Sequence, residues 1–477
     1  MMKVHLSISS FRKIGAVILR ISVCAVLTIG ILGKVFLPMQ KPKDNMFYYY
    51  QLEKNTVDVL FIGSSHVYCS VNPLELYLKT GVRGYDLAMG SQAMWHAYYV
   101  LKEALKTQTP KVVMLDVYML KDIDDSGFAE KTEGNLQSMR PSWNKYEALK
   151  ASEVEKESMW DIFWGFPMYH DRYGELEKKD YVELRPEENL MGYSCHLRTE
   201  PLDNEEVNDV SGIKEALPIS DKAESYLRMF IELCQQKDIQ MVLINSPWPD
   251  IDEEAMQRYN YVENIAKEYQ IDFLNGCRLH KELAFDWTRD RMDDGGHLNY
   301  YGSLKWTDYL ADYLSNSKLK DYRPEGSLWW QKNLECLQEA LYREEIQEIK
   351  SAQAALQYLM LHPELSYAVS VNTIDPYPEE AIETLRQLGM TLYDESAYIL
   401  KAPDGKVIMG TEEDADVPEL EYGTKMVGID KKSNEDCIIL RCNGKELEDT
   451  DASECNIWIY NNKTDDWFCN LAFDWEY

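Results

Sequence analysis

The sequence contains no Cys-x-x-Cys pair and no His-x-x-x-His pair, the spacings that zinc sites often use. A resident metal is therefore not supported, and we expect no cofactor. Four of the ten cysteines gather near the C-terminus, namely Cys437, Cys442, Cys455 and Cys469. Outside the cell these four could pair as disulfides, in a pattern that sequence cannot choose, and small buried thiols are the alternative.

Positive charge is scarce in the chain. It has 50 Lys and Arg residues against 81 Asp and Glu, for a net charge of −31. Such a surface repels nucleic acid and anionic lipid, so neither is an expected partner. Acidity alone identifies no partner, and a solvated surface is its simplest interpretation.

One long apolar run occurs near the N-terminus, from Ile14 to Phe36. Arg12 and Lys13 precede it, which predicts a cytoplasmic N-terminus and an extracytoplasmic remainder. The competing interpretation is a cleaved signal peptide with its apolar core at Ile21 to Gly33. Because no Ala-x-Ala site follows that core, we expect an uncleaved single-pass anchor with its spacer, over residues 1–45.

Strand-like and helix-like segments alternate from residue 46 to 321. This alternation predicts a doubly wound parallel α/β sheet of flavodoxin-like type, with its chemistry at the carboxyl ends of the strands. The expected strands are Val57 to Ile62, Gly84 to Ala88, Lys111 to Leu115, Gln240 to Ile244 and Ile271 to Leu274.

Residues 119–220 fit no unit of this sheet and form an insertion longer than an ordinary connection. The insertion is charged and aromatic, and it leaves the carboxyl end of a predicted strand. We expect it to cover the site as a lid, with Tyr169, His170 and Arg172 lining the cleft. The alternative is that its aromatic residues form a core of their own.

Residues 322–477 form a second, smaller, β-rich α/β unit without an obvious catalytic group. Leu365 to Val371 is strand-like, and Pro403-Asp-Gly405 predicts a hairpin between Tyr398–Leu400 and Val407–Met409. Further strands are expected at Cys437 to Cys442 and Ile457 to Tyr460.

Two short motifs carry the chemistry. The first apolar strand stops abruptly at Gly63-Ser64-Ser65-His66, and Asp293-Asp294-Gly-Gly-His297 lies near the end of the same domain. A serine at a strand end needs a base to take its proton, and the base needs a carboxylate to orient it. Ser65 and His297 are therefore the candidate nucleophile and base. His66 is too close in sequence to Ser65 to reach its hydroxyl easily.

On these motifs, residues 57–315 resemble the SGNH, or GDSL-like, hydrolases, in particular a membrane-anchored branch that includes the teichoic acid D-alanine-transfer protein and alginate O-acetylation proteins. The resemblance implies Asp294 as the carboxylate that holds His297. It also implies an oxyanion hole made by the backbone N–H groups of Ser65 and Gly90. The family's third block carries an asparagine donor, but the equivalent strand here ends in Asp116.

The missing donor has several candidates, which are Asn245, Tyr118 and the lid. Asn245 is also a tentative substrate-lining residue. The C-terminal unit more faintly resembles the interleukin-like epithelial–mesenchymal-transition inducer domain, through Tyr367 to Val371, Leu385 to Gly389 and Asn456 to Tyr460. That resemblance implies sugar binding, and a packing module is the alternative.

Together these features predict a membrane-anchored, extracytoplasmic SGNH-type acyltransferase or esterase. Its expected substrate is the O-acyl groups of a cell-envelope polysaccharide or teichoic-type polymer, processed through an acyl-serine intermediate. The resemblance implies a multi-pass membrane-bound O-acyltransferase as partner. The alternative is a non-catalytic envelope scaffold or carbohydrate-binding protein with a degenerate site.

Overall fold

A computed structural model describes the protein at residues 15–25, 27–28, 44–122, 134–152, 156–164, 186–317, 319, 328–371, 379–390, 396–411, 419–431, 438–446, 454–461 and 466–474. The chain divides into two compact units, Met1–Gln338 and Glu339–Tyr477. The division falls inside helix α14 (Leu328–Gln347), whereas the sequence placed a boundary at 321/322. Trp330 of this helix donates from Nε1 to the Gly84 carbonyl oxygen at 3.0 Å, within the first unit.

The first unit is built on a five-stranded sheet with the order β2-β1-β3-β4-β5. Every neighbouring pair in this sheet is parallel, as the sequence predicted. The order reverses between β1 and β3, and ligands of such sheets bind beyond the carboxyl ends of strands at the reversal. The strands are β1 (Val59–Ile62), β2 (Gly84–Asp86), β3 (Val112–Asp116), β4 (Gln240–Asn245) and β5 (Asp272–Asn275).

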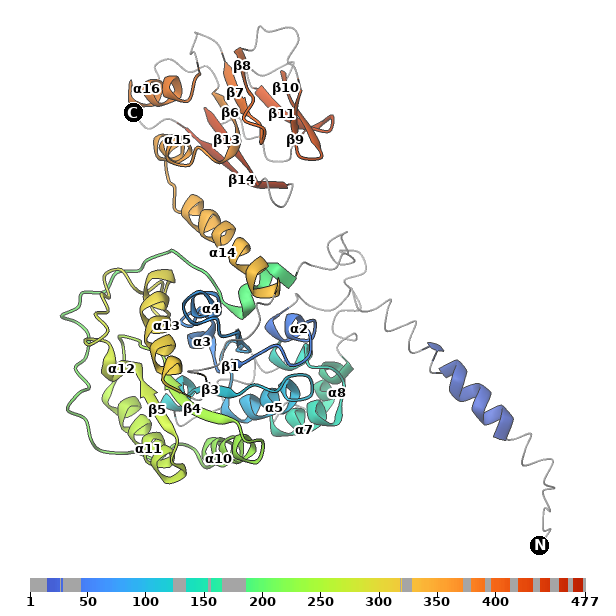
Figure 1. Ribbon diagram of the computed structural model, residues 1–477, viewed down its shortest axis with the longest axis vertical. Helices are drawn as coiled ribbons and strands as arrows, with labels where there is room; N and C mark the ends of the chain where they lie inside the picture. Colours follow the sequence, from blue (N-terminus) through green and yellow to red (C-terminus); the bar gives the residue numbers. More distant parts are fainter. Residues whose placement is uncertain are drawn as a thin grey trace. The chain divides into compact units, whose positions relative to one another are not determined.

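Helices cover both faces of the sheet (Figure 1). Helices α4 (Pro73–Thr80) and α13 (Tyr300–Ser315) pack together on one face, and α5 (Met94–Ala104) packs with α10 (Asp221–Gln236) on the other. The remaining helices of this unit are α2 (Asn45–Tyr49), α3 (Ser65–Tyr68), η2 (Tyr118–Lys121), α7 (Trp143–Ala151), α8 (Lys156–Trp164), η6 (Pro186–Gly192), α11 (Glu253–Tyr269) and α12 (Gly276–Leu279).

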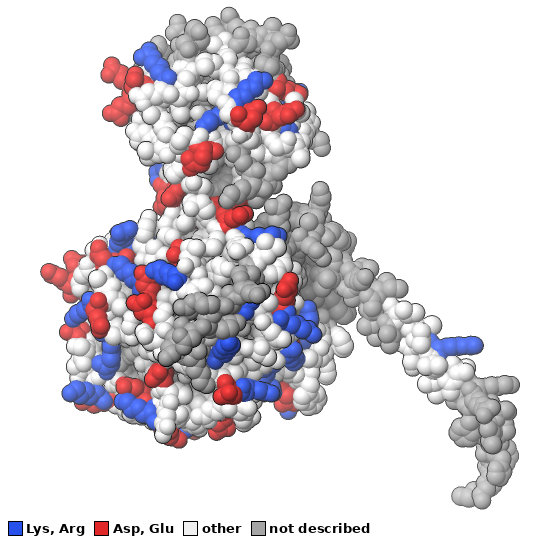
Figure 2. Space-filling view, in the orientation of Figure 1, with Lys and Arg blue, Asp and Glu red and all other residues white. Residues whose placement is uncertain are grey.

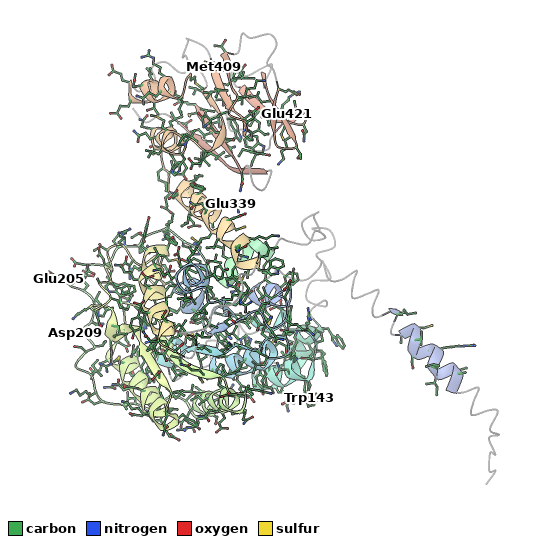
Figure 3. All side chains as sticks on the ribbon, viewed as in Figure 1. Trp143, Glu205, Asp209, Glu339, Met409 and Glu421 are labelled. Atoms are coloured by element: carbon green, nitrogen blue, oxygen red, sulfur yellow. The ribbon has the colours of Figure 1, made fainter. Side chains whose placement is uncertain are left out.

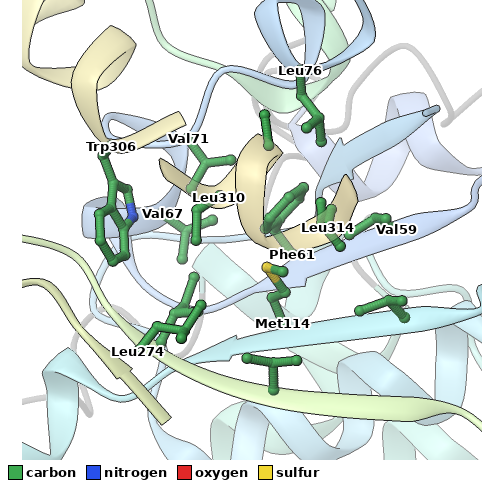
Figure 4. Packing of buried hydrophobic residues seen from close by; sticks show 14 of the residues in the cluster. Val59, Phe61, Val67, Val71, Leu76, Met114, Leu274, Trp306, Leu310 and Leu314 are labelled. Atoms are coloured by element: carbon green, nitrogen blue, oxygen red, sulfur yellow. The ribbon is translucent and has the colours of Figure 1, made fainter. Parts of the chain in front are cut away.

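The hydrophobic core on the α4–α13 face fixes the start of the site. All four residues of β1 are buried, as expected for a strand covered on both faces. Phe61 of β1 packs in one cluster with Val67 of α3 and with Trp306 and Leu310 of α13 (Figure 4). Each fully buried side chain of this size contributes roughly 1.5–3 kcal/mol of transfer free energy. The core therefore holds α3, which begins within the first predicted motif, and α13, which follows the second, against the same strand.

The second unit has two antiparallel sheets, with the strand orders β14-β13-β6-β7-β8 and β12-β11-β10-β9. Residues of both sheets share a buried cluster that includes Tyr398, Tyr422 and Trp458. The predicted hairpin is confirmed, because β7 pairs with β8 and Gly405 takes a φ of +82° at the turn. The elements are α15 (Ala352–Leu361), β6 (Ser366–Val371), α16 (Glu379–Gln387), β7 (Ala397–Lys401), β8 (Val407–Thr411), β9 (Leu420–Tyr422), β10 (Lys425–Lys431), β11 (Ile438–Cys442), β12 (Lys445–Glu446), β13 (Cys455–Asn461) and β14 (Asp466–Phe473).

Three features predicted from the sequence can be compared with the structure, namely cysteine pairing, the N-terminal apolar run and the surface charge. Cys442 and Cys455 carry free thiols, so neither takes part in a disulfide. Within the described residues no helix is both long and apolar enough to cross a membrane, and residues 14, 26 and 29–36 of the run from Ile14 to Phe36 lie outside them. On the face of the first unit drawn in Figure 2, acidic and basic side chains are interspersed.

Candidate active site

The Ser65 hydroxyl stands at the start of α3, directly after the turn that ends β1. Ser64 caps this helix, since its side chain accepts a hydrogen bond from the His66 N–H at 3.3 Å. Gly63 is required in the turn, because a Cβ there would lie 2.6 Å from both the Asp116 Cβ and a Val67 methyl. Ser65 is therefore presented at the carboxyl end of β1, beside the point where the strand order reverses.

His297 is delivered by a tight loop that precedes α13. The Met292 N–H donates to the His297 carbonyl at 3.0 Å, and the Gly296 N–H donates to the Asp293 carbonyl at 3.2 Å. Gly296 has a φ of +73°, a conformation that L side chains rarely adopt, and it turns the chain back so that His297 lies over Asp293. Asn299 caps α13 by accepting the Gly302 N–H at 3.1 Å.

Serine, histidine and aspartate meet in one hydrogen-bonded chain. Ser65 Oγ lies 2.7 Å from His297 Nε2, as the sequence predicted. His297 Nδ1 lies 2.9 Å from both carboxylate oxygens of Asp293. This contact favours the tautomer with a proton on Nδ1, which leaves Nε2 to accept the serine proton. The side chains of His297 and Asp293 are 22% and 36% exposed, so the site opens to solvent.

The prediction of Asp294 as the orienting carboxylate is corrected to Asp293. The Asp294 side chain is 96% exposed and contacts Arg291 at 3.3 Å instead of His297. Arg291 is buried and also donates from Nε to the Glu200 carbonyl at 2.7 Å. In the turn, Asp293 is the carboxylate that folds under the imidazole, while Asp294 ties the outside of the loop to Arg291.

His66 lies beside the triad without touching the serine hydroxyl. Its ring is fully buried and stacks on Tyr118, with centroids 3.4 Å apart, and on His297, with centroids 4.6 Å apart. Burial lowers the pKa of His66 well below its usual range, and the facing His297 and Lys121 lower it further. A neutral His66 ring therefore supports one face of the His297 imidazole.

Gly90 is placed beside the nucleophile turn. The loop after β2 continues to pair with the end of β1, through Leu87 N–H to the Phe61 carbonyl at 2.8 Å and Met89 N–H to the Gly63 carbonyl at 3.1 Å. Asn135, in the insertion, donates from Nδ2 to the Gly90 carbonyl at 2.8 Å. This pairing brings the predicted oxyanion loop alongside the Ser65 turn.

Tyr68 also faces this region, a contact that sequence reasoning missed. Its hydroxyl lies near Ser65, one helical turn earlier in α3. A Cβ at Gly90 would lie 3.9 Å from the same hydroxyl. The helical i, i+3 spacing from Ser65 was the available signal, since such residues share a face.

Asp116 and Asn245, at the ends of β3 and β4, direct their side chains to other partners. Asp116 accepts the Tyr118 N–H at 3.0 Å and the Ser246 N–H at 3.2 Å, so both of its oxygens hold backbone amides. Burial raises the pKa of Asp116 to about 7, against the lowering effect of these two amides. Asn245 directs its Nδ2 to Asn275 Oδ1 at 3.3 Å and to Cys277 Sγ at 3.4 Å, so its predicted role as donor or substrate-lining residue is not supported.

Described residues of the insertion also contact α3 and the start of α13, the two helices beside the triad. The Ser194 N–H donates to the Tyr68 carbonyl, and the His196 carbonyl accepts the Tyr300 N–H, both at 2.7 Å. The predicted cleft residues Tyr169, His170 and Arg172 lie outside the described residues. Among the described residues no group of three His, Cys, Asp or Glu side chains is placed to hold a metal ion.

Aromatic residues of the insertion also occupy the surface. Trp143 of α7 is labelled in Figure 3, and its side chain is 74% exposed. Its ring lies 5.1 Å from that of Tyr146, measured between centroids. Ile162 of α8 is buried, whereas Trp160 and Trp164 are about half exposed. The described aromatic residues of α7 and α8 are thus only partly used in a core of the insertion.

No family model and no curated protein matches the chain. Among solved structures, it is similar to a G-D-S-L family protein from Desulfitobacterium hafniense DCB-2, at 12% identity and a TM-score of 0.28, over 54% of this chain and 99% of that one. A GDSL-like lipase from Bacteroides thetaiotaomicron VPI-5482 is similar at 11% identity and a TM-score of 0.29, over 57% and 99%.

An acetyl xylan esterase from the rumen bacterium Butyrivibrio proteoclasticus is similar at 9% identity and a TM-score of 0.25, over 56% of this chain and 65% of that one. Likenesses this weak carry no functional argument.

Proposed function

We propose that this protein is a serine-dependent enzyme of SGNH type that transfers or hydrolyses acyl groups held in ester bonds. The observation that carries the proposal is the hydrogen-bonded chain from Ser65 through His297 to Asp293, with distances of 2.7 and 2.9 Å. Ser65 meets His297, which lies 232 residues later in the sequence, and His297 in turn meets the nearby Asp293. The three side chains stand in the order that nucleophilic catalysis needs, at the strand end where such sheets bind ligands.

The mechanism follows from the direction of these bonds. Ser65 Oγ attacks the ester carbonyl carbon while His297 Nε2 takes its proton. Asp293 holds the Nδ1 proton and stabilises the imidazolium that forms. His297 then returns the proton to the departing alkoxide, which leaves an acyl-Ser65. Water or a sugar hydroxyl, deprotonated by the same His297, attacks this acyl group and restores the serine.

We further propose that the ester belongs to a cell-envelope polysaccharide or teichoic-type polymer. The partial exposure of His297 and Asp293 supports a substrate that protrudes from a larger molecule. The apolar run from Ile14 to Phe36 supports a membrane anchor with the catalytic unit outside the cell. A multi-pass membrane-bound O-acyltransferase is the proposed partner, because the outer face of a membrane lacks its own supply of activated acyl groups.

The full-length protein tests the central claim with 4-nitrophenyl acetate and a fluorophosphonate probe. Wild type is expected to release nitrophenolate and to be labelled on Ser65, as located by mass spectrometry of peptides. Ser65→Ala should abolish both signals, and His297→Gln should reduce them by a factor on the order of 10³ or more. Ser211→Ala, at an exposed loop position, is the matched control.

Two outcomes would count against the proposal. Labelling that persists in Ser65→Ala would remove the nucleophile assignment. A wild type inert to both reagents would favour a non-catalytic envelope protein. A sugar acceptor added to the active enzyme separates transfer from hydrolysis, because transfer yields an acylated sugar at the expense of free acid.

A further inference from the structure

The oxyanion formed by attack on an ester needs donors, and the side-chain donor is not obvious. Strand β3 ends in Asp116, whose two oxygens accept backbone N–H groups. The Asn245 amide is bonded to Asn275 and Cys277. We propose that the phenol hydroxyl of Tyr68 is the side-chain donor to the oxyanion. The inference rests on the proposed function and adds a catalytic residue to it.

The position of Tyr68 supports this role. Ser65 and Tyr68 are the first and last residues of α3, so their side chains lie on the same face of one helical turn. The Tyr68 hydroxyl lies near Ser65 and 3.9 Å from the place of a Cβ on Gly90. The hydroxyl therefore sits between the nucleophile and the predicted oxyanion loop, where the carbonyl oxygen of a bound ester must lie.

The hydrogen-bond directions make Tyr68 a donor. His297 Nε2 accepts the Ser65 proton, because Nδ1 donates to Asp293. The Ser65 oxygen then has only lone pairs to offer a neighbouring hydroxyl, so the phenol of Tyr68 can interact with it only as a donor. When Oγ bonds to the carbonyl carbon, the carbonyl π pair moves to oxygen and Oγ becomes a weaker acceptor. The Tyr68 proton turns to the adjacent oxyanion without leaving the phenol.

Two further contacts preorganise the hydroxyl. The Tyr68 carbonyl accepts the Ser194 N–H at 2.7 Å, which fixes the end of the short helix. Burial raises the pKa of Tyr68 to about 12, and nearby Cys69 and Asp293 also raise it. The phenol is therefore protonated at neutral and mildly alkaline pH, as a donor must be.

The test uses full-length Tyr68→Phe with 4-nitrophenyl acetate and its thiono analogue. Sulfur accepts hydrogen bonds weakly, so an oxyanion donor stabilises the reaction of the oxygen ester more than that of the sulfur ester. We expect kcat for the oxygen ester to fall by a factor on the order of 10² with little change in KM, and the preference for oxygen over sulfur to shrink. Tyr300→Phe is the matched control, since the Tyr300 hydroxyl lies 3.4 Å from Glu75 Oε1.

Two results would overturn the inference. An unchanged kcat would show that the hydroxyl is not used. Equal losses on both esters would show that Tyr68 only orients Ser65. A wild type without any Ser65-dependent turnover would instead remove the proposed function, and the Tyr68 inference with it.

A second variant guards against misfolding of Tyr68→Phe. Replacing Tyr68 with 3,5-difluorotyrosine keeps the shape of the ring and lowers the pKa of its phenol. Because a phenolate cannot donate, we expect kcat to decline at a lower pH than in wild type. An alkaline limb that stays in place would contradict the role of Tyr68 as donor.

Discussion

The imidazole of His66 lies against the imidazole of His297, with ring centroids 4.6 Å apart and planes inclined by 30°. His66 also stacks on Tyr118, with ring centroids 3.4 Å apart. The ring nitrogens of His66 make no hydrogen bond of good geometry within the described chain, although a weak contact with the Gly295 backbone opposes the fall in its pKa. The neutral ring of His66 thus packs against the His297 imidazole and restricts its rotation.

Substitutions at His66 should separate shape from polarity. His66→Phe keeps an aromatic ring and removes buried nitrogens that are poorly satisfied, so we expect kcat within roughly threefold of wild type and no loss of stability. His66→Ala leaves a cavity beside His297. We expect it to lose about 2–4 kcal/mol of unfolding free energy and roughly tenfold or more in kcat. Urea denaturation and ester hydrolysis measure the two quantities.

If both variants lose activity equally while the fold is intact, the ring nitrogens of His66 contribute to activity, and the interpretation that His66 acts only by packing against His297 is wrong. Equal stability of the two variants would likewise contradict a packing role for the ring.

The adjacent aspartates should behave very differently. Asp293→Asn removes the charge that stabilises imidazolium and disturbs the tautomer of His297, so we expect kcat to fall by a factor on the order of 10²–10⁴. Asp294→Asn changes an exposed side chain whose one described contact is with Arg291, and should keep kcat within roughly threefold. Steady-state hydrolysis of 4-nitrophenyl acetate compares them. The reverse ranking would restore Asp294 as the orienting residue.

This pair also shows what the sequence could and could not predict. Ser65 and His297 were predictable, because a serine after a buried strand and a histidine before the last helix of an α/β unit meet at one sheet edge. The choice between Asp293 and Asp294 was not, since it depends on a turn in which Gly296 adopts a positive φ. Spacing alone does not show which carboxylate such a turn places under the ring.

The roles of His66 and Tyr68 were harder to predict for a similar reason. His66 follows Ser65 directly and cannot reach its hydroxyl, so the sequence offered no partner for it. Its partner, His297, is 231 residues later by the sequence numbering, and the stack forms only after the sheet has assembled. For Tyr68, the length of the helix after Ser65 decides whether its hydroxyl turns back to the nucleophile.

The buried Asp116 should leave a signature in the dependence of stability on pH. Its carboxyl has a pKa of about 7 in the folded protein, mainly through burial, against about 3.9 in an unfolded chain. Between these values the folded state holds a proton that the unfolded state has lost, so its contribution to stability decreases as pH rises from about 4 to 7.

Asp116→Asn removes this titration. We expect the unfolding free energy of wild type, relative to the variant, to be about 2 kcal/mol more favourable at pH 5 than at pH 8. Chemical denaturation at both pH values provides the comparison, and Asp122→Asn, at an exposed position, is the control. A difference that does not vary with pH would mean that Asp116 is ionised throughout.

Gly63 couples the end of β1 to the site, and a methyl group there should disturb both. The Cβ of Gly63→Ala would lie 2.6 Å from the Asp116 Cβ and 2.6 Å from a Val67 methyl, closer than atoms in proteins approach. The strand end or α3 must therefore shift, and Ser65 with it. We expect a loss of about 1–3 kcal/mol in unfolding free energy and a fall in kcat of roughly tenfold or more.

The control for Gly63→Ala is Gly212→Ala. At Gly212 a Cβ would meet nothing within 4 Å, so this variant should change stability by less than about 0.5 kcal/mol. Urea denaturation and ester hydrolysis of both variants decide the matter. Wild-type stability and activity in Gly63→Ala would show that the turn can yield without moving the nucleophile, and that the close approach to Asp116 is not needed to present Ser65.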